Sequence, residues 1–183
     1  MSRIRVITGS AGGLFLKVPP RFHSRPTQDR VKQAIFSSLG ARVPAARVLD
    51  LYAGTGALGI EALSRGADRV TFVESKAPCC KTIEENLAWC KLSGTVIKQD
   101  VAIFVQSCKN PHDLILADPP YEKERRDLAT HEVIRAIAPL LAPGGLLVWE
   151  HDSRNIWSDP APLTVLKTVR YGETAVSYLA VKE

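Results

Sequence analysis

The sequence predicts a single α/β fold built on a mainly parallel sheet of seven strands that ends in an antiparallel hairpin. From residue 47 onward, short apolar segments alternate with segments of helical periodicity, which is the pattern of a parallel sheet covered on both faces. The last two β-branched segments follow one another directly, as the strands of a hairpin do. A length of 183 residues fits one domain, and 45% hydrophobic with 23% charged residues excludes a disordered chain.

The first 46 residues are predicted to form a small unit of their own, an N-terminal hairpin followed by a helix. Strands are expected at residues 4–8 and 14–18, joined by a glycine-rich turn. A helix is expected at residues 27–39, with Thr27 as its cap and Gly40 at its end. We therefore divide the chain into an N-terminal basic unit, residues 1–46, and a main domain, residues 47–183.

In the main domain, seven strands and four helices are expected. The strands are residues 47–51, 69–74, 95–98, 113–117, 145–150, 163–171 and 173–181, and the helices are residues 56–65, 76–92, 101–108 and 127–141. Ser75 is expected to cap the second of these helices. Ligands of such sheets bind beyond the carboxyl ends of the strands, so functional residues are expected in the loops that follow them.

Charge is distributed unevenly along the chain. Residues 1–47 hold nine Lys or Arg side chains and one acidic side chain, a net charge of +8, whereas the remaining residues carry 15 basic and 18 acidic side chains, a net charge of −3. A basic N-terminal surface suits a polyanion, because clustered cations release counterions from phosphates. A merely solvated basic face is the alternative.

Several functional classes are not expected from the composition. No apolar run approaches the roughly 18 residues of a membrane span, and the first residues lack the apolar core of a secretory signal. We therefore expect a cytoplasmic protein with no membrane partner. The four cysteines, Cys79, Cys80, Cys90 and Cys108, form no C-x-x-C pair, and buried thiols explain them better than a metal site.

A glycine-rich loop between Asp50 and Gly59 follows the first strand of the main domain. Glycine suits a loop where backbone approaches a ligand closely, and a helix that begins there points free N–H groups outward. Gly54, Gly56 and Gly59 have the spacing of a dinucleotide-binding fold. Glu74 ends the next strand, where a carboxylate can accept hydrogen bonds from ribose hydroxyls. The combination predicts a nucleoside cofactor, and a plain tight turn is the alternative.

Two further carboxylates, Asp50 and Asp100, help to identify the nucleoside cofactor. Asp50 would repel a pyrophosphate but can attract the cationic methionine end of S-adenosylmethionine. This favours S-adenosylmethionine over a nicotinamide dinucleotide, whose oxidoreductases would need a substrate domain that the chain does not obviously offer. Asp100 follows the third strand and can accept a hydrogen bond from the adenine amine, serve as a helix N-cap, or do both.

A second motif, Asp118-Pro119-Pro120-Tyr121, directly follows the fourth strand. Two successive prolines fix an extended loop whose carbonyls have no neighbouring N–H groups. Asp118 and the Pro119 carbonyl can each accept one hydrogen of an exocyclic amine, and Tyr121 can stack on its ring, which contributes about 1–3 kcal/mol. The motif indicates a site for a flat, amine-bearing base. A rigid strand exit with a packed tyrosine is the alternative.

Together these motifs resemble those of the class I S-adenosylmethionine-dependent methyltransferases, which have a Rossmann-like fold. The segments RVITG at residues 5–9, SRPTQDRVK at residues 24–32 and RYGETAVSY at residues 170–178 make the sequence similar to the bacterial 16S ribosomal RNA guanine-N2 methyltransferase family. The Asp-Pro-Pro-Tyr motif is shared with DNA adenine-N6 methyltransferases. An adenine-N6 methyltransferase acting on DNA or RNA is therefore one alternative, and an RNA-binding ribosome-assembly factor with an unused cofactor pocket is another.

The resemblance implies methyl transfer from S-adenosylmethionine to the N2 amine of a loop guanine in 16S rRNA, within an assembled or partly assembled small ribosomal subunit. It implies no metal, and we expect a monomer. The catalytic residues it implies are Asp118, Pro119, Pro120 and Tyr121. The cofactor-binding residues it implies are Asp50, Ala53, Gly54, Gly56, Glu74, Ser75, Asp100 and Val101. Candidate RNA contacts are Arg25, Thr27, Arg30 and Lys32, with the last two expected on the exposed face of their helix.

Overall fold

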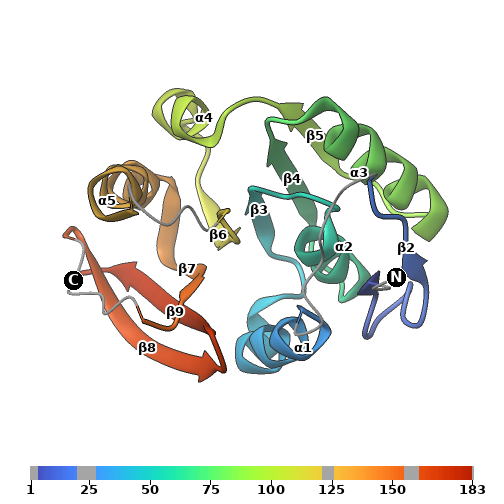
Figure 1. Ribbon diagram of the computed structural model, residues 1–183, viewed down its shortest axis with the longest axis horizontal. Helices are drawn as coiled ribbons and strands as arrows, with labels where there is room; N and C mark the ends of the chain where they lie inside the picture. The colour runs from blue at the N-terminus through green and yellow to red at the C-terminus, as the bar shows by residue number, and fades with distance from the viewer. Residues whose placement is uncertain (1–3, 20–27, 121–125, 155–160, 183) are drawn as a thin grey trace.

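The structure, a computed structural model, describes residues 4–19, 28–120, 126–154 and 161–182. Its centre is a seven-stranded sheet in the order β5-β4-β3-β6-β7-β9-β8 (Figure 1). Strands β3 to β7 pair in parallel, whereas β9 pairs antiparallel with both β7 and β8. The predicted fold, a mainly parallel sheet with a C-terminal antiparallel hairpin, is confirmed.

The strands of this sheet match the apolar segments of the sequence closely. They are β3 (Arg47–Leu51), β4 (Arg69–Glu74), β5 (Thr95–Lys98), β6 (His112–Ala117), β7 (Leu141–Asp152), β8 (Leu163–Tyr171) and β9 (Thr174–Val181). Only β7 is much longer than predicted, because it begins four residues earlier and pairs with β6 across a register shift.

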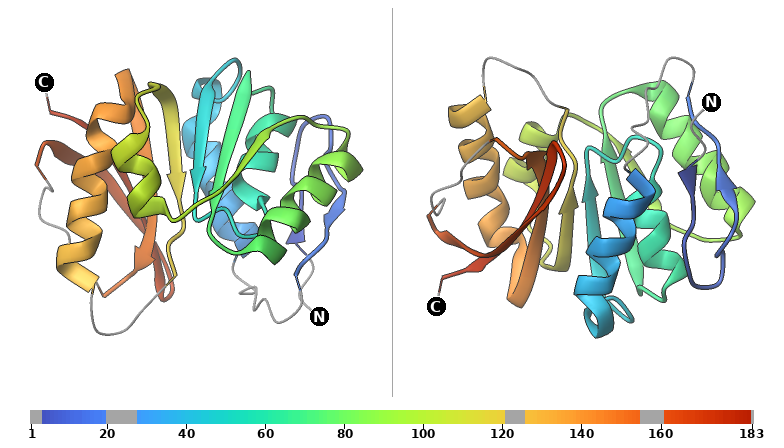
Figure 2. Two further views of the ribbon diagram at one scale, coloured as in Figure 1. Left: turned by 90° about the horizontal axis from the view of Figure 1, so that it is seen from above. Right: turned by 60° about the horizontal axis from the view of Figure 1, so that its bottom comes forward.

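Helices cover both faces of the sheet (Figure 2). They are α1 (Gln28–Leu39), α2 (Ala57–Ser64), α3 (Ala77–Cys90), α4 (Val101–Ser107) and α5 (Arg126–Ile137). Apolar side chains of α1, α2 and α3 share one buried cluster with Val48 and Phe72. Those of α4 and α5 share a second cluster with Leu49 and Val73. Neighbouring strand residues point to opposite faces, so each strand supplies both clusters.

The N-terminal hairpin stands apart from the sheet, beside α2 and α3 (Figure 1). Its strands, β1 (Ile4–Arg5) and β2 (Phe15–Leu16), are antiparallel and shorter than predicted. Ile4 and Leu16 are buried in the same cluster as α1, α2 and α3. Apolar side chains from both sides of residue 46 thus share one core, and the division into residues 1–46 and 47–183 stays a prediction.

Two local predictions were wrong. Ser75 does not cap α3, because Lys76 occupies the N-cap position and no side chain caps the helix there. The helix expected at residues 127–141 ends at Ile137 and continues only as a short 3-10 helix, Ala138–Leu140. Pro139 has no N–H with which to continue the α-helical ladder. Among the residues that the structure describes, none of the helices has the length and apolar character needed to span a membrane.

Candidate active site

A cavity of about 280 Å³ opens where the carboxyl ends of β3, β4 and β6 meet. It is lined by residues from both predicted motifs, so the fold brings the glycine-rich loop and the Asp-Pro-Pro segment together. The predicted site residues in its wall are Lys32, Asp50, Ala53, Gly54, Glu74, Ser75, Asp118, Pro119 and Pro120. Tyr121 lies outside the described residues.

The glycine-rich loop has a left-handed backbone at three positions. Tyr52, Gly54 and Gly56 have φ angles of 57°, 56° and 78°. Gly56 is the N-cap of α2, so the helix starts directly beneath the loop. Glycine is also needed one turn later for packing, because a Cβ on Gly59 would lie 2.2 Å from Phe72 Cε1. Glycines are therefore needed in this segment for two reasons, the left-handed backbone of the loop and the close packing of α2 on β4.

Glu74 holds this loop in place from the end of β4. Its Oε2 accepts a hydrogen bond of 2.9 Å from the Gly54 N–H, and its Oε1 accepts one of 2.8 Å from the Lys76 N–H. The residue is only 8% exposed and lines the cavity. Because each carboxylate oxygen can accept more than one hydrogen bond, Glu74 can also accept from two vicinal hydroxyls of a ligand.

Asp50 lies deeper in the same wall. Its Oδ2 accepts a hydrogen bond of 2.8 Å from the Gly59 N–H at the first turn of α2. Burial raises the pKa of this carboxyl well above its usual range, and the nearby Asp118 and Glu74 carboxylates raise it further. A cationic group entering the cavity would oppose this shift and favour the charged carboxylate.

Asp118, Pro119 and Pro120 continue directly from β6, the neighbour of β3, and line the same cavity. Glu150, near the end of the neighbouring β7, is 7% exposed and lines the cavity beside them. The sequence analysis missed this carboxylate. Its position in the last residue of a predicted parallel strand was the signal, since such ends gather at the ligand edge of the sheet.

Tyr52 is a second residue of the cavity wall that the sequence analysis did not single out. Its ring meets Trp149 edge to face, with ring centroids 6.2 Å apart. Burial, with a smaller contribution from the Asp100 carboxylate, raises the pKa of Tyr52 to about 12. The phenol therefore stays neutral at physiological pH and acts as a rigid, amphipathic wall.

Three predicted cofactor residues are absent from the described cavity wall. Gly56 lies beneath the loop as the N-cap of α2. Asp100 is exposed and caps α4, accepting a hydrogen bond of 2.8 Å from the Ala102 N–H. Val101 is buried in the apolar cluster under α4 and α5. The N-cap role of Asp100 is thus present, while its contact with adenine stays a prediction.

The candidate RNA contacts divide into exposed and buried residues. Arg30 is exposed on α1, as predicted. The prediction that Lys32 is exposed was wrong, because the residue is only 3% accessible. Its Nζ donates a hydrogen bond to the Arg5 carbonyl and lies 3.8 Å from Glu61 Oε2. Arg25 and Thr27 lie outside the described residues.

The cysteines are placed as the sequence suggested. Cys79, Cys80 and Cys90 are free and buried on α3, and Cys108 is partly exposed. Burial raises the pKa of each of the three buried thiols. Within the described ranges, no group of three His, Cys, Asp or Glu side chains is arranged to hold a metal ion.

Residues 4–180 match the model of a protein family described as Conserved hypothetical protein 95. The chain belongs to this family. YlbH of Bacillus subtilis, provisionally named an rRNA methyltransferase, is 34% identical over 95% of this chain and 97% of its own length. Ribosomal RNA small subunit methyltransferase D of Escherichia coli is 36% identical over 66% of this chain and 62% of its own length.

Solved structures agree with the fold of this family member. The Escherichia coli protein yhhF, provisionally named a methyltransferase, has a TM-score of 0.84 at 31% identity, covering 99% of both chains. The T. thermophilus 16S rRNA N2 methyltransferase RsmC, solved with AdoMet and guanosine, has a TM-score of 0.73 at 22% identity. That alignment covers 90% of this chain and 45% of RsmC. The predicted Rossmann-like methyltransferase fold is confirmed.

Proposed function

We propose that this protein transfers a methyl group from S-adenosylmethionine to the exocyclic N2 amine of a guanine in 16S rRNA. The observation that carries the proposal is one cavity with two unlike walls. Gly54 and Glu74 offer the groups that hold a nucleoside, and Asp118 and Pro119 offer acceptors for an amine. The names of the relatives YlbH and methyltransferase D support an rRNA substrate.

The residues of the first wall fit the proposed cofactor. Glu74 is a fixed carboxylate suited to the two ribose hydroxyls, with Ser75 and Cys79 beside it. Asp50 and Ala53 line the part of the loop nearest β3 and β6, where the cationic methionine portion would lie. Asp100 and Val101 are proposed at the adenine end. When bound, S-adenosylmethionine supplies an electrophilic methyl group on a sulfonium centre.

The residues of the second wall would orient the amine that attacks this methyl group. Asp118 and the Pro119 carbonyl accept one amine hydrogen each, which turns the nitrogen lone pair toward the methyl group. Transfer would form a new N–C bond as the S–C bond of the bound cofactor breaks, and Asp118 or water would take the departing amine proton. Alignment of this kind can contribute about 7–11 kcal/mol to lowering a barrier. Pro120 stiffens the segment, and Tyr121 is proposed to stack on the base.

The substrate is proposed to be an assembled or partly assembled small ribosomal subunit, bound by a monomer of this protein in the cytoplasm. The target guanine must leave its stack, which costs a few kcal/mol and less in a loop than in a duplex. Arg25, Thr27 and Arg30 are proposed to contact RNA phosphates. Lys32 is withdrawn from this group because its side chain is buried and lines the cavity.

The test uses purified protein, methyl-labelled S-adenosylmethionine and small subunits that lack the modification, followed by digestion of the RNA to nucleosides. Label in N2-methylguanosine, absent with Asp118→Ala, supports both the reaction and the site. Label in N6-methyladenosine would replace guanine by adenine as the target. Asp118→Ala should leave cofactor binding within about threefold, and equal loss of binding and transfer would contradict its role.

A further inference from the structure

Lys32 is a buried cation in the wall of the candidate active site. The side chain comes from α1, is 4% exposed, and lines the cavity together with the first turn of α2. Burial lowers the pKa of its amine, while the nearby Glu61 and Asp29 carboxylates act in the opposite direction. Of the side chains that line the described cavity, Lys32 and Lys76 are the cationic ones.

The hydrogen bonds that Lys32 makes to protein do not use all of the N–H donors of its ammonium group. Its Nζ donates to the Arg5 carbonyl at 2.5 Å. Its Nζ also lies 3.6 Å from an Asp29 oxygen and 3.8 Å from a Glu61 oxygen, and the Asp29 carboxylate is within reach of a second donor. A lysine ammonium has three N–H donors, so one remains for a ligand in the cavity.

The Glu61 carboxylate beside Lys32 already accepts hydrogen bonds from other residues. Glu61 is fully buried and accepts hydrogen bonds from Ile7 N–H at 2.7 Å, Thr8 N–H at 3.1 Å and Arg65 Nε at 2.7 Å. The Arg65 cation balances its charge, and the two backbone donors stabilise it further. An anionic ligand group in the cavity could therefore pair with Lys32, and the mostly acidic groups elsewhere in the wall would disfavour that anion at other positions.

The position of Lys32 matches one portion of the proposed cofactor. In the proposed binding mode, the ribose lies at Glu74, at the end of β4. The methyl group lies near Asp118, directly after β6. Lys76 lies two residues after Glu74 and so belongs to the ribose end. The remaining wall consists of Ile4, Lys32, the glycine-rich loop that follows Asp50, and the first turn of α2, and Lys32 is the cation of this part. The amino-acid end of the cofactor is the portion left for this part of the cavity.

We propose that the Lys32 ammonium binds the α-carboxylate of the methionine portion of S-adenosylmethionine. This proposal rests on the proposed function, since it assumes that cofactor. It assigns Lys32 to the donor side of the reaction rather than to RNA. It also gives the N-terminal unit a direct part in cofactor binding, because α1 carries the residue.

The test compares two ligands that differ only in this carboxylate, S-adenosylmethionine and decarboxylated S-adenosylmethionine, by calorimetric titration of wild-type protein and Lys32→Met. Wild-type protein should prefer the carboxylate-bearing ligand by about 10- to 100-fold, as a charge-assisted hydrogen bond would provide. In Lys32→Met this preference should fall to within about threefold, while affinity for the decarboxylated ligand stays near the wild-type value. Such a cycle isolates the pairwise contribution.

Lys17→Met is the matched control. It removes an exposed lysine of the same N-terminal unit that does not line the cavity, so the ligand preference should stay at the wild-type value. Unchanged preference in Lys32→Met, or an equal loss in Lys17→Met, would overturn the proposal.

Two further outcomes separate this proposal from the proposed function. Failure of wild-type protein to bind either ligand would refute the proposed function itself. If Lys32→Met does not fold by circular dichroism, Lys32→Gln replaces it. Equal affinity of wild-type protein for the two ligands overturns the role of Lys32 without any variant.

Discussion

Carboxylates fix the backbone in both the glycine-rich loop and the N-terminal hairpin, but they act over very different separations in sequence. At the loop, Asp50 accepts from Gly59, nine residues later, and Glu74 accepts from Gly54, 20 residues earlier. At the hairpin, Glu61 on α2 accepts from residues 7 and 8, which lie 54 and 53 residues earlier in the chain.

This difference in separation determines what each carboxylate stabilises. The loop carboxylates belong to the same β-α-β unit as the backbone they hold, so they shape a ligand wall locally. Glu61 joins the N-terminal unit to the helix that begins at the glycine-rich loop. The N-terminal unit is thus fastened to the cofactor wall by a buried charge as well as by apolar packing.

The largest effect is expected from Glu61→Gln, which breaks the long-range contact. The change leaves the buried Lys32 and the partly exposed Arg65 without their shared partner, at a cost of about 3 kcal/mol in unfolding free energy. Urea unfolding measures the loss, and hydrogen exchange should show the Ile7 and Thr8 amides becoming less protected. Glu132→Gln, exposed on α5, is the control and should leave both measurements unchanged.

A smaller loss of stability is expected from Gly59→Ala, which tests the packing beneath the loop. The new Cβ would lie 2.2 Å from Phe72 Cε1, so strand β4 or α2 must shift, at a cost of about 2–3 kcal/mol. Gly40→Ala has open space around its Cβ and a φ of 48°, so it should cost only about 1 kcal/mol, through backbone strain alone. Equal losses of unfolding free energy would contradict this packing account.

Glu74→Gln should affect cofactor binding more than stability. Its amide can accept hydrogen bonds through only one atom, so it cannot hold Gly54 and two ribose hydroxyls as the carboxylate does. We expect S-adenosylmethionine affinity to fall about tenfold, equivalent to about 1.4 kcal/mol. Isothermal titration provides the measurement, with Glu84→Gln, exposed on α3, as its control. If Glu74→Gln lowered the unfolding free energy as much as Glu61→Gln does, the proposed difference between the two regions would be contradicted.

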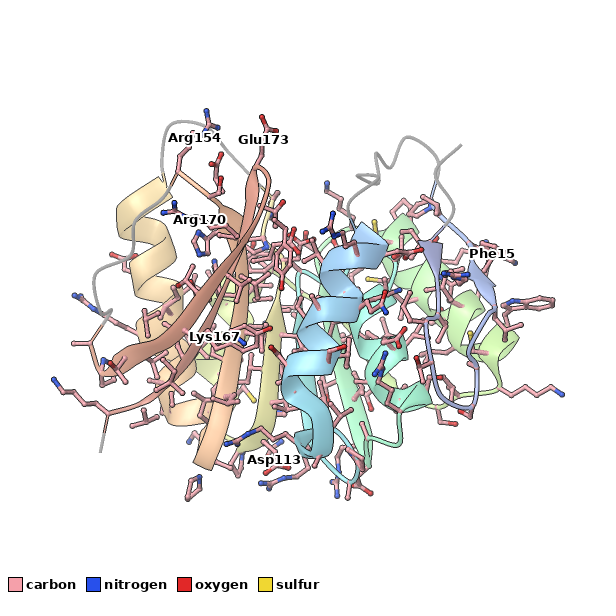
Figure 3. The ribbon with its side chains drawn as sticks, turned by 90° about the horizontal axis from the view of Figure 1, so that it is seen from below. Phe15, Asp113, Arg154, Lys167, Arg170 and Glu173 are labelled. Carbon is pink, nitrogen blue, oxygen red and sulfur yellow. The ribbon has the colours of Figure 1, made fainter. Side chains whose placement is uncertain are left out.

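The smallest effect concerns Asp113, near the start of β6 and at the end of the molecule opposite Arg154 and Glu173 (Figure 3). Hydrogen bonds from the Arg47 guanidinium lower the pKa of Asp113 to about 2. A lowered carboxyl pKa adds stability above its ordinary value of about 3.8, and this stability is lost as pH falls toward 2. Because the Asp113 side chain is 40% exposed, screening limits the contribution to less than about 1 kcal/mol.

Asp113→Asn tests the pH-dependent contribution of the Arg47–Asp113 pair to stability. Its unfolding free energy should lie slightly below that of wild-type protein at pH 6, and the difference should shrink between pH 4 and pH 2.5. A difference that grows on acidification would have the wrong sign. Cofactor affinity should not change, since Asp113 does not line the described cavity.

The sequence predicted most local features of the site but missed two residues of the cavity wall, Tyr52 and Glu150, and the long-range burial of Lys32. The glycine-rich loop, Glu74 and the Asp-Pro-Pro segment depend on spacing within one strand-loop-helix unit, which is visible in the sequence. The burial of Lys32 depends on the hairpin folding against α1 and α2. One signal was present, because Lys32 lies three and four residues before Ile35 and Phe36, on the buried face of the helix.

The central claim is that one cavity holds the methyl donor and the guanine amine at the same time. An isotope-partitioning experiment tests it most directly. Protein is first bound to methyl-labelled S-adenosylmethionine and then mixed with unmodified small subunits and a large excess of unlabelled cofactor. The account predicts that a substantial share of the bound label appears in N2-methylguanosine before it exchanges. Label found in another nucleoside, or no transfer of bound label with any excess of subunits, would contradict it.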